Sequence, residues 1–249
     1  MRALILAAGR GERMRPLTDT TPKPLLPLRG KPIIEWHLEA LARAGVCEVV
    51  INTAWMEEQF PVALGDGARW GLAIRYSTEG RDHGGALETA GGIRKALPWL
   101  APRGDEAFWV VSGDIFMPGF EFAPGLATAF AAGPDLGWLW LVANPSFHGS
   151  GDFRLDGDRL RRGAPQPWTY ANVALLRPAL VASLPLGQRA ALGPLLFEAA
   201  AADRLAGRVL DGPWHNLGTP AQLTALNDTP DERRSSAATD SFVANQEDT

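Results

Sequence analysis

The sequence predicts an α/β protein in which helices cover a mostly parallel sheet. Its first half alternates short apolar runs with segments whose apolar residues recur at helical spacing. A β-α-β-α-β succession of this kind joins parallel strands through right-handed crossovers, which place helices on the faces of the sheet. The composition, 46% hydrophobic and 21% charged over 249 residues, is that of an ordinary globular protein.

The predicted elements follow one another without an internal repeat or a linker. Strands are expected at residues 3–8, 46–52, 72–76, 108–112, 136–142, 153–155, 159–161, 168–176 and 208–210. Helices are expected at residues 33–44, 56–64, from 87 onward, 123–132, 192–206 and 220–226. Residues 1–228 are therefore predicted to form one domain. Residues 229–249 are polar with almost no large apolar side chains, so we expect them to form a disordered tail.

The first functional signal is a basic loop near the N-terminus. The apolar run 3–8 breaks at Gly9, and Arg10, Gly11, Arg13 and Arg15 follow within a few residues. Glycines directly after a buried strand let the backbone turn tightly and bring its N–H groups to a ligand. Arginines supply charge-assisted donors for phosphate oxygens, and Lys23 follows between two prolines that restrict its backbone. The pattern predicts a loop that holds a polyphosphate.

Two common phosphate-binding loops do not match this pattern. The dinucleotide fingerprint needs a third glycine where this chain has Met14, and an acidic residue where the second strand ends in Asn52. The P-loop needs Gly-Lys-Ser or Gly-Lys-Thr at the start of a helix, and the sequence contains neither tripeptide.

Composition excludes several other classes of protein. A net charge of −4 disagrees with a general nucleic-acid binder, and one cysteine, Cys47, excludes an intramolecular disulfide and a cysteine zinc cluster. We expect Cys47 to pack in the core beside its strand. No apolar run is long enough to span a bilayer, and Met1-Arg2 leads into a strand without a signal peptide. We therefore expect a cytoplasmic protein with no nucleic-acid, membrane or obligate protein partner.

The string LAAGRGERMRPLT, followed closely by PKPLLP, resembles the opening of the sugar-1-phosphate nucleotidylyltransferases. Matching motifs continue to residue 219. The resemblance implies a Rossmann-like three-layer α/β/α nucleotidyltransferase fold with a mostly parallel mixed sheet. It implies an enzyme that joins a nucleoside triphosphate to a sugar 1-phosphate and releases pyrophosphate. By residue match, the nucleotide would be held by Ala8, Gly9, Arg10, Gly11, Glu12, Arg13, Lys23, Glu79, Thr89 and Gly92.

The predicted catalytic residues are Arg13, Lys23 and Asp114. Asp114 follows the apolar strand 108–112, where a carboxylate suits Mg²⁺, and the resemblance implies that this aspartate carries the metal. The second metal ligand would lie in a closing motif, Trp-x-Asp-x-Gly-Thr, in which this chain has Asn216. A carboxamide oxygen can ligate Mg²⁺ but lacks the carboxylate charge, so we expect weaker binding.

The substrates follow from the resemblance alone. Asn144, Asp152 and Asn172 would contact the sugar. The stretches LAAGRGERMRPLTDTTPKPLLPL, GDGARWGLAIRYSTEG and NPSFHGSGDFRL imply UTP as nucleotide and N-acetylmuramic acid α-1-phosphate as acceptor, in peptidoglycan recycling. Two alternatives stay open. One is a glucose- or mannose-1-phosphate nucleotidylyltransferase that uses UTP, dTTP or GTP. The other is a catalytically weakened nucleotide-sugar-binding paralogue, which only Asn216 favours.

Overall fold

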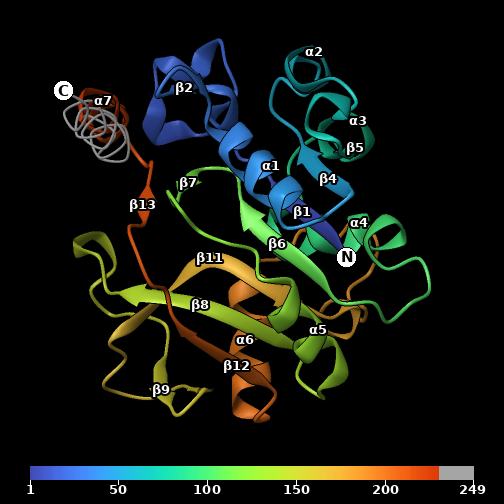
Figure 1. Cartoon of the computed structure of the whole chain (residues 1–249), viewed down its shortest axis with the longest axis vertical. Helices are drawn as coiled ribbons and strands as arrows, with labels where there is room; N and C mark the ends of the chain where they lie inside the picture. Colours follow the sequence, from blue (N-terminus) through green and yellow to red (C-terminus); the bar gives the residue numbers. More distant parts are fainter. Residues whose placement is uncertain (230–249) are drawn as a thin grey trace, which may run out of the picture.

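The computed structural model describes residues 1–229 and contains a nine-stranded sheet in the order β5-β4-β1-β6-β11-β8-β12-β10-β9 (Figure 1). The strands of its first half are β1 (Arg2–Leu6), β4 (Glu48–Thr53), β5 (Ala73–Thr78) and β6 (Phe108–Ser112). β1 pairs in parallel with β4 and β6, and β4 pairs in parallel with β5. The carboxyl ends of these strands therefore meet at one edge of the sheet.

The second half of the sheet is mixed. Its strands are β8 (Gly137–Ala143), β9 (Arg154–Asp156), β10 (Arg159–Arg161), β11 (Trp168–Leu176) and β12 (Leu205–Val209). β11 is antiparallel to both β6 and β8, so β8 runs in the same direction as β6. β12 is parallel to β8, and the predicted hairpin of β9 and β10 closes this end of the sheet.

Helices cover both faces, which confirms the predicted three-layer α/β/α fold. They are α1 (Ile33–Arg43), α2 (Gln59–Leu64), α3 (Glu79–His83), α4 (Glu88–Leu100), α5 (Pro124–Ala132), α6 (Leu192–Ala201) and α7 (Pro220–Asp228). One hydrophobic core lies between the sheet and α1, α2 and α5, and a second lies between the sheet and α4 and α6. In Figure 1, α1 and α5 lie in front of the sheet and α6 behind it.

Periodicity explains why the first helix forms where it does. Ile34, Leu38 and Leu41 recur at helical spacing and are fully buried against the sheet. The helix ends before Gly45, whose φ of +75° suits the residue that follows a helix.

Two short ribbons lie outside the main sheet. β2 (Pro27–Leu28) pairs with β3 (Lys31–Pro32), and β7 (Ile115–Phe116) pairs with β13 (His215–Asn216). The second ribbon joins residues that are about a hundred positions apart in the sequence. It brings the segment before α7 back to the end of β6, as the red strand β13 shows in Figure 1.

Three details differ from the sequence-based expectation. The segment after β5 forms the short helix α3 instead of a loop. The predicted helix 192–206 ends early because Asp203 adopts a φ of +57°, and β12 then begins at Leu205. Cys47 is exposed at the start of its strand, not packed in the core.

Two further expectations concern the outer parts of the chain. Apart from Thr229, the tail predicted over residues 229–249 lies outside the described residues. Within residues 1–229, no helix has the length and apolar character that a membrane crossing requires.

Trp109 provides a test of the first core. Its side chain is 1% exposed, and its ring lies 5.0 Å from that of Phe122 and 5.3 Å from that of Trp140. Trp109→Ala should lower the free energy of unfolding by about 3 to 5 kcal/mol, because it leaves a cavity that packed rings cannot fill. Urea denaturation measures this loss. Val62→Ala, at a residue 88% exposed, is the control and should change stability by less than about 0.5 kcal/mol.

Candidate active site

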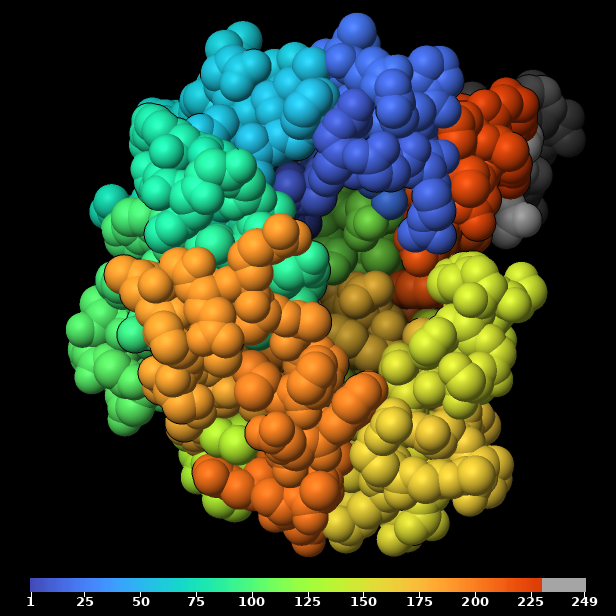
Figure 2. All heavy atoms as spheres, turned by 180° about the vertical axis from the view of Figure 1, so that it is seen from behind, coloured from blue at the N-terminus to red at the C-terminus, as the bar shows by residue number. Residues whose placement is uncertain are grey.

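A cavity of about 510 Å³ lies at the carboxyl ends of β1, β4 and β6. Most of the residues predicted to bind nucleotide or to catalyse the reaction line it: Ala8, Gly9, Arg10, Gly11, Glu12, Arg13, Lys23, Thr89 and Asp114. Figure 2 shows this side of the molecule hollowed between the N-terminal segment in blue, the loop before α6 in orange and the yellow segment after β8. The structure thus brings residues 8–13, Lys23, Thr89 and Asp114, which are distant in the sequence, to one cavity.

The loop after β1 is compact because Gly11 adopts a φ of +69°. A Cβ at this position would lie 3.0 Å from Thr18 Cγ2 and 3.3 Å from Lys23 Cβ. The Thr18 hydroxyl donates a hydrogen bond to the Gly11 carbonyl at 2.9 Å. By contrast, a Cβ at Gly9 would meet no atom within 4 Å. The loop therefore packs tightly on one side and leaves its Gly9 backbone open to the cavity.

The two arginines of this loop differ in their partners. The guanidinium of Arg10 donates to the Thr18 carbonyl at 2.7 Å and to Asp19 at 2.8 Å, and it stacks on Trp55 at 3.8 Å. The hydrogen bond from Arg10 lowers the pKa of the Asp19 carboxyl. Within the described chain, Arg13 has no ion pair or side-chain hydrogen bond. Arg10 stabilises the loop, whereas Arg13 is available to a ligand.

Lys23 and Asp114 form an ion pair at the centre of the site. The Lys23 Nζ lies 2.7 Å from Asp114 Oδ2. The lysine side chain is 9% exposed and that of the aspartate is 38% exposed. A buried ammonium needs its counter-ion, because an unpaired charge in the interior is strongly destabilising. The pair fixes the lysine while part of the carboxylate still faces the cavity.

The ribbon of β7 and β13 places Asn216 beside this pair. Asn216 is the partner of Ile115, and the Leu217 N–H donates to the Asp114 carbonyl at 3.1 Å. Among residues 1–229, no group of three or more histidine, cysteine or acidic side chains could hold a metal. Asp114 and Asn216 nonetheless fit Mg²⁺, which takes one or two carboxylates and completes its shell with water and substrate phosphates.

A histidine that the sequence-based reasoning missed lies beneath the turn that carries Asp114. His37, on α1, is 3% exposed, and its Nε2 lies 2.9 Å from the Ile115 carbonyl. Burial lowers the pKa of His37 from 6.5 to about 4, so its ring is neutral near pH 7. No motif could have revealed it, because its position in an amphipathic helix resembles an ordinary core position.

Glu79 and Gly92 do not line the cavity. Glu79 is fully buried, and its two carboxylate oxygens accept hydrogen bonds from Asn52 Nδ2 and the Leu87 N–H, each at 2.7 Å. Burial raises the pKa of this carboxyl. A Cβ at Gly92 would lie 2.6 Å from both the Asn52 and the Glu79 side chains. In this structure Glu79 therefore supports the cavity wall from behind, and Gly92 leaves room for it.

Asn52 links that buried carboxylate to the cavity. Its side chain lines the cavity, and its Oδ1 accepts a hydrogen bond from the Ala7 N–H at 2.8 Å. In the sequence, Asn52 was notable only because a dinucleotide fingerprint would have an acidic residue at that position. Its position at the end of a central strand was the signal that could have identified it.

A loop before α6 completes the wall near Thr89. The Thr89 hydroxyl accepts a hydrogen bond from the Leu192 N–H at 2.8 Å. The Ala190 N–H donates to the Leu87 carbonyl, and the Ala190 carbonyl accepts from the Ala90 and Gly91 N–H groups. Arg189, which the sequence-based reasoning missed, lines the cavity from this loop. Its exposed ion pair with Glu88 is long, at 3.4 Å, and holds it weakly.

The three predicted sugar contacts occupy different positions. The side chains of Asn144 and Asp152 form hydrogen bonds within the segment between β8 and β11 and with the first residues of β11, and neither residue lines the cavity. Asn172 is half-buried with a φ of +61°, in a bulge of β11. It directly precedes Val173, which pairs with Val111 near the end of β6. Asn172 therefore lies beside the strand that leads to Asp114.

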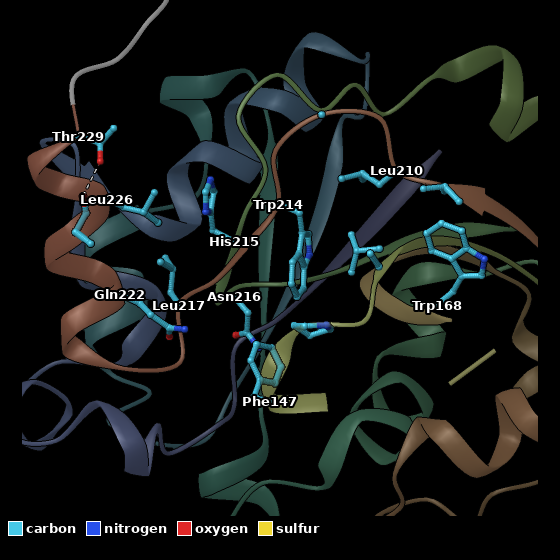
Figure 3. A pocket seen from close by; sticks show the side chains of 16 residues that line it. Phe147, Trp168, Leu210, Trp214, His215, Asn216, Leu217, Gln222, Leu226 and Thr229 are labelled. Atoms are coloured by element: carbon cyan, nitrogen blue, oxygen red, sulfur yellow. Dashed lines mark hydrogen bonds between the residues drawn. The ribbon is translucent and has the colours of Figure 1, made fainter. Parts of the chain in front are cut away.

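A second cavity of about 710 Å³ lies at the carboxyl ends of β8 and β12 (Figure 3). Aromatic side chains form part of its wall, namely Phe147, Trp168, Trp214 and His215. Asn216 lines this cavity, while Gly218 lines the first. The segment 215–218 thus borders both cavities.

The sequence of residues 2–142 matches the family model of the nucleotidyl transferases, over more than half of the chain. The chain belongs to this family, and it is an enzyme of the nucleotidyltransferase class.

Relatives of similar length extend the match beyond residue 142. The N-acetylmuramate alpha-1-phosphate uridylyltransferase of Neisseria meningitidis is 44% identical over 90% of this chain and 95% of its own length. The protein of the same name from Caulobacter vibrioides is 34% identical over 90% and 94%. A proposed glucose-1-phosphate thymidylyltransferase from Bacillus anthracis, crystallised with sucrose, shares the fold. Its TM-score is 0.78 at 18% identity, over 93% of this chain and 97% of that one.

The buried His37 predicts a pH dependence of stability. The unfolded chain binds a proton at this histidine below pH 6.5, whereas the folded protein does so only near pH 4. The unfolded state therefore holds more protons between these values, and stability falls as the pH decreases through this window. Between pH 7 and pH 5, His37→Gln should lose about 2 kcal/mol less than the wild type. Urea denaturation in EDTA measures both proteins, and parallel curves would contradict the assignment.

Proposed function

We propose that the enzyme transfers the uridylyl group of UTP to the phosphate of N-acetylmuramic acid α-1-phosphate. The products are UDP-N-acetylmuramic acid and pyrophosphate. The observation that carries the proposal is the pair of Lys23 and Asp114 in a cavity that also contains Arg13, which has no partner among residues 1–229, and the open backbone at Gly9. The names of the two relatives of similar length support the choice of nucleotide and acceptor.

The cavity suits a triphosphate because its fixed cations lie beside backbone that a ligand can approach. Residues 8–12 line it together with Arg13 and Lys23. Charge-assisted hydrogen bonds from a guanidinium are strong and directional, so Arg13 is placed to stabilise charge around the α- and β-phosphates. Thr89 and Asn52 lie farther along the same wall, where the uridine would bind.

The reaction needs positioned charges more than acid–base chemistry. An oxygen of the acceptor phosphate attacks the α-phosphorus of UTP. The bond from that phosphorus to the bridging oxygen breaks in line, and pyrophosphate leaves with the electron pair. The attacking oxygen is already anionic, so no general base is required. Lys23, fixed by Asp114, neutralises charge as it spreads over the reacting phosphates.

Asp114 and Asn216 are the residues that would hold Mg²⁺. When bound, the ion would neutralise phosphate charge and bring the two anionic substrates together. Asn216 lies on β13 opposite Ile115, the residue after Asp114, so the ribbon of β7 and β13 holds the backbones of the two residues near each other. We place the reaction in cytoplasmic peptidoglycan recycling, and we propose that residues 1–228 act as one domain.

The first test is an assay of pyrophosphate release from UTP with Mg²⁺ and a panel of sugar 1-phosphates. The proposal predicts at least a tenfold higher kcat/KM for N-acetylmuramic acid α-1-phosphate than for glucose 1-phosphate or mannose 1-phosphate. Asp114→Ala should lose all measurable turnover. Lys23→Ala, which leaves a carboxylate that is 38% exposed, should lose at least a hundredfold with unchanged circular dichroism. Preference for another sugar or for dTTP or GTP would refute the proposed substrates. The absence of pyrophosphate release with every pair of nucleotide and sugar 1-phosphate would favour a nucleotide-sugar-binding protein.

Asn216→Asp tests the metal assignment. A carboxylate in place of the carboxamide adds charge to a site with a single acidic ligand, so the Mg²⁺ concentration for half-maximal rate should fall several-fold. A titration of the rate with MgCl₂ at fixed UTP measures this shift. Asn227→Asp, on α7, is the matched control and should leave the titration unchanged. An unchanged titration for Asn216→Asp itself would show that residue 216 is not a ligand.

A further inference from the structure

We propose that Asn52 and Glu79 form a positioning pair that sets the affinity of the enzyme for its nucleotide. The inference rests on the proposed use of UTP. It concerns the part of the cavity wall between the loop after β1 and the start of α4. The pair takes no part in the transfer itself and acts through the two backbone segments that it holds together.

Three hydrogen bonds join these segments in one chain. The Ala7 N–H donates to Asn52 Oδ1 at 2.8 Å, and Asn52 Nδ2 donates to Glu79 Oε1 at 2.7 Å. The Leu87 N–H donates to Glu79 Oε2 at 2.7 Å. Asn52 is 2% exposed and Glu79 is fully buried, so water cannot easily replace either partner. A lost bond would therefore leave a buried polar group unpaired, which is costly.

The chain of bonds ends on both sides at the wall of the nucleotide cavity. Ala7 lines the cavity at the end of β1, shortly before the loop that carries Arg13. Leu87 directly precedes Glu88, which lines the cavity at the start of α4. A shift within the pair would thus move these two parts of the wall relative to each other.

The turn at Leu87 and Glu88 requires support of this kind. Glu88 has a φ of +64°, which is disfavoured for a residue with a side chain. Such a conformation persists where the surrounding contacts fix it. The Glu79 carboxylate holds the Leu87 N–H, and the Ala190 N–H donates to the Leu87 carbonyl at 3.0 Å. Loss of the Glu79 contact should therefore let the turn relax away from its position at the cavity.

The two ends of the chain of bonds determine which groups the pair can contain. Both ends are backbone N–H groups, which only donate, so the pair must present an acceptor oxygen to each of them. The central bond then needs one donor and one acceptor. One amide and one carboxylate meet this condition, in either order. Two amides would leave two N–H groups facing each other, and two carboxylates would place like charges in contact.

Helix α4 leaves little room for the pair to rearrange. A Cβ at Gly92 would lie 2.6 Å from both Asn52 Nδ2 and Glu79 Oε1, the two atoms of the central bond. Farther along the same helix, Lys95 Nζ donates to the Thr78 carbonyl at 2.7 Å and so holds the residue before Glu79. A mismatched pair should therefore displace the cavity wall and not be absorbed by a small local shift.

The test exchanges the two functional groups. Glu79→Gln and Asn52→Asp each mismatch the central bond, so each should weaken UTP binding at least about tenfold in calorimetric titrations with Mg²⁺. The double variant that combines both substitutions again contains one amide and one carboxylate. It should bind UTP within about threefold of the wild type, whereas independent effects would multiply to about a hundredfold. Glu58→Gln and Asn227→Asp are the matched controls at exposed residues outside the cavity wall and should change nothing.

The Kd distinguishes positioning from a merely structural role. A pair that only stabilises the fold would lower the melting temperature and the fraction of protein that binds, but not the Kd of that fraction. Unchanged Kd values for both single variants would refute the inference, as would a double variant that binds UTP no better than Glu79→Gln. If Asn52→Asp does not fold, the double variant and Glu79→Gln decide. The double variant must then fold and bind UTP more tightly than Glu79→Gln.

The same titrations separate this inference from the proposed function. If the wild type binds UTP but transfers the uridylyl group to no acceptor, the function fails and the Kd values still decide the inference. If the wild type prefers dTTP or GTP, the proposed nucleotide is wrong and the comparison is made with the preferred one. If it binds no nucleoside triphosphate, both the function and the inference are refuted.

Discussion

The ion pair between Lys23 and Asp114 is the contact on which the rest of the site depends. It joins the N-terminal loop to the end of β6, and the turn that carries Asp114 is held by two further contacts. His37 contacts the Ile115 carbonyl from below, and the Leu217 N–H bonds the Asp114 carbonyl from the side. A buried lysine without this carboxylate would carry an uncompensated charge. The same ion pair therefore stabilises the folded cavity and positions the Lys23 ammonium in it.

The charged groups of the cavity divide into those that build it and those that face a ligand. Arg10 is bound on three sides, and the carboxylate of Glu79 is bound at both oxygens. Arg13 and Arg189 extend from these braced segments with weak partners or none in the described chain. Preorganised donors are most effective when their supports do not move during the reaction, and the braced residues supply that rigidity.

Much of this architecture could be predicted from the sequence, because its signals are local. The strands of the first half, the glycine- and arginine-containing loop after β1 and the position of Asp114 at a strand end all follow from runs of apolar residues and the glycines and prolines between them. The role of Asn144 could not be predicted, because an asparagine after a strand looks the same whether it binds a sugar or a nearby carbonyl. No sequence motif marks His37 or Arg189, because only tertiary contacts place these residues at the site. The end of α6 was misjudged because an alanine-rich run favours helix, whereas pairing with β8 decides where β12 begins.

The contact between the loop before α6 and the start of α4 has a mechanical consequence. Ala190 is bonded to both sides of that helix start, and a Cβ at Gly91 would lie 2.4 Å from the Gln188 carbonyl oxygen. On the other side, a Cβ at Gly187 would lie 2.9 Å from the ring of His83 in α3. The loop before α6 is thus in close contact with both α3 and the first turn of α4, beside the cavity wall that contains Arg189 and Thr89. If the cavity opens to release pyrophosphate or the nucleotide sugar, the loop before α6 and the start of α4 should move together. Arg189 and Thr89 would then move with them.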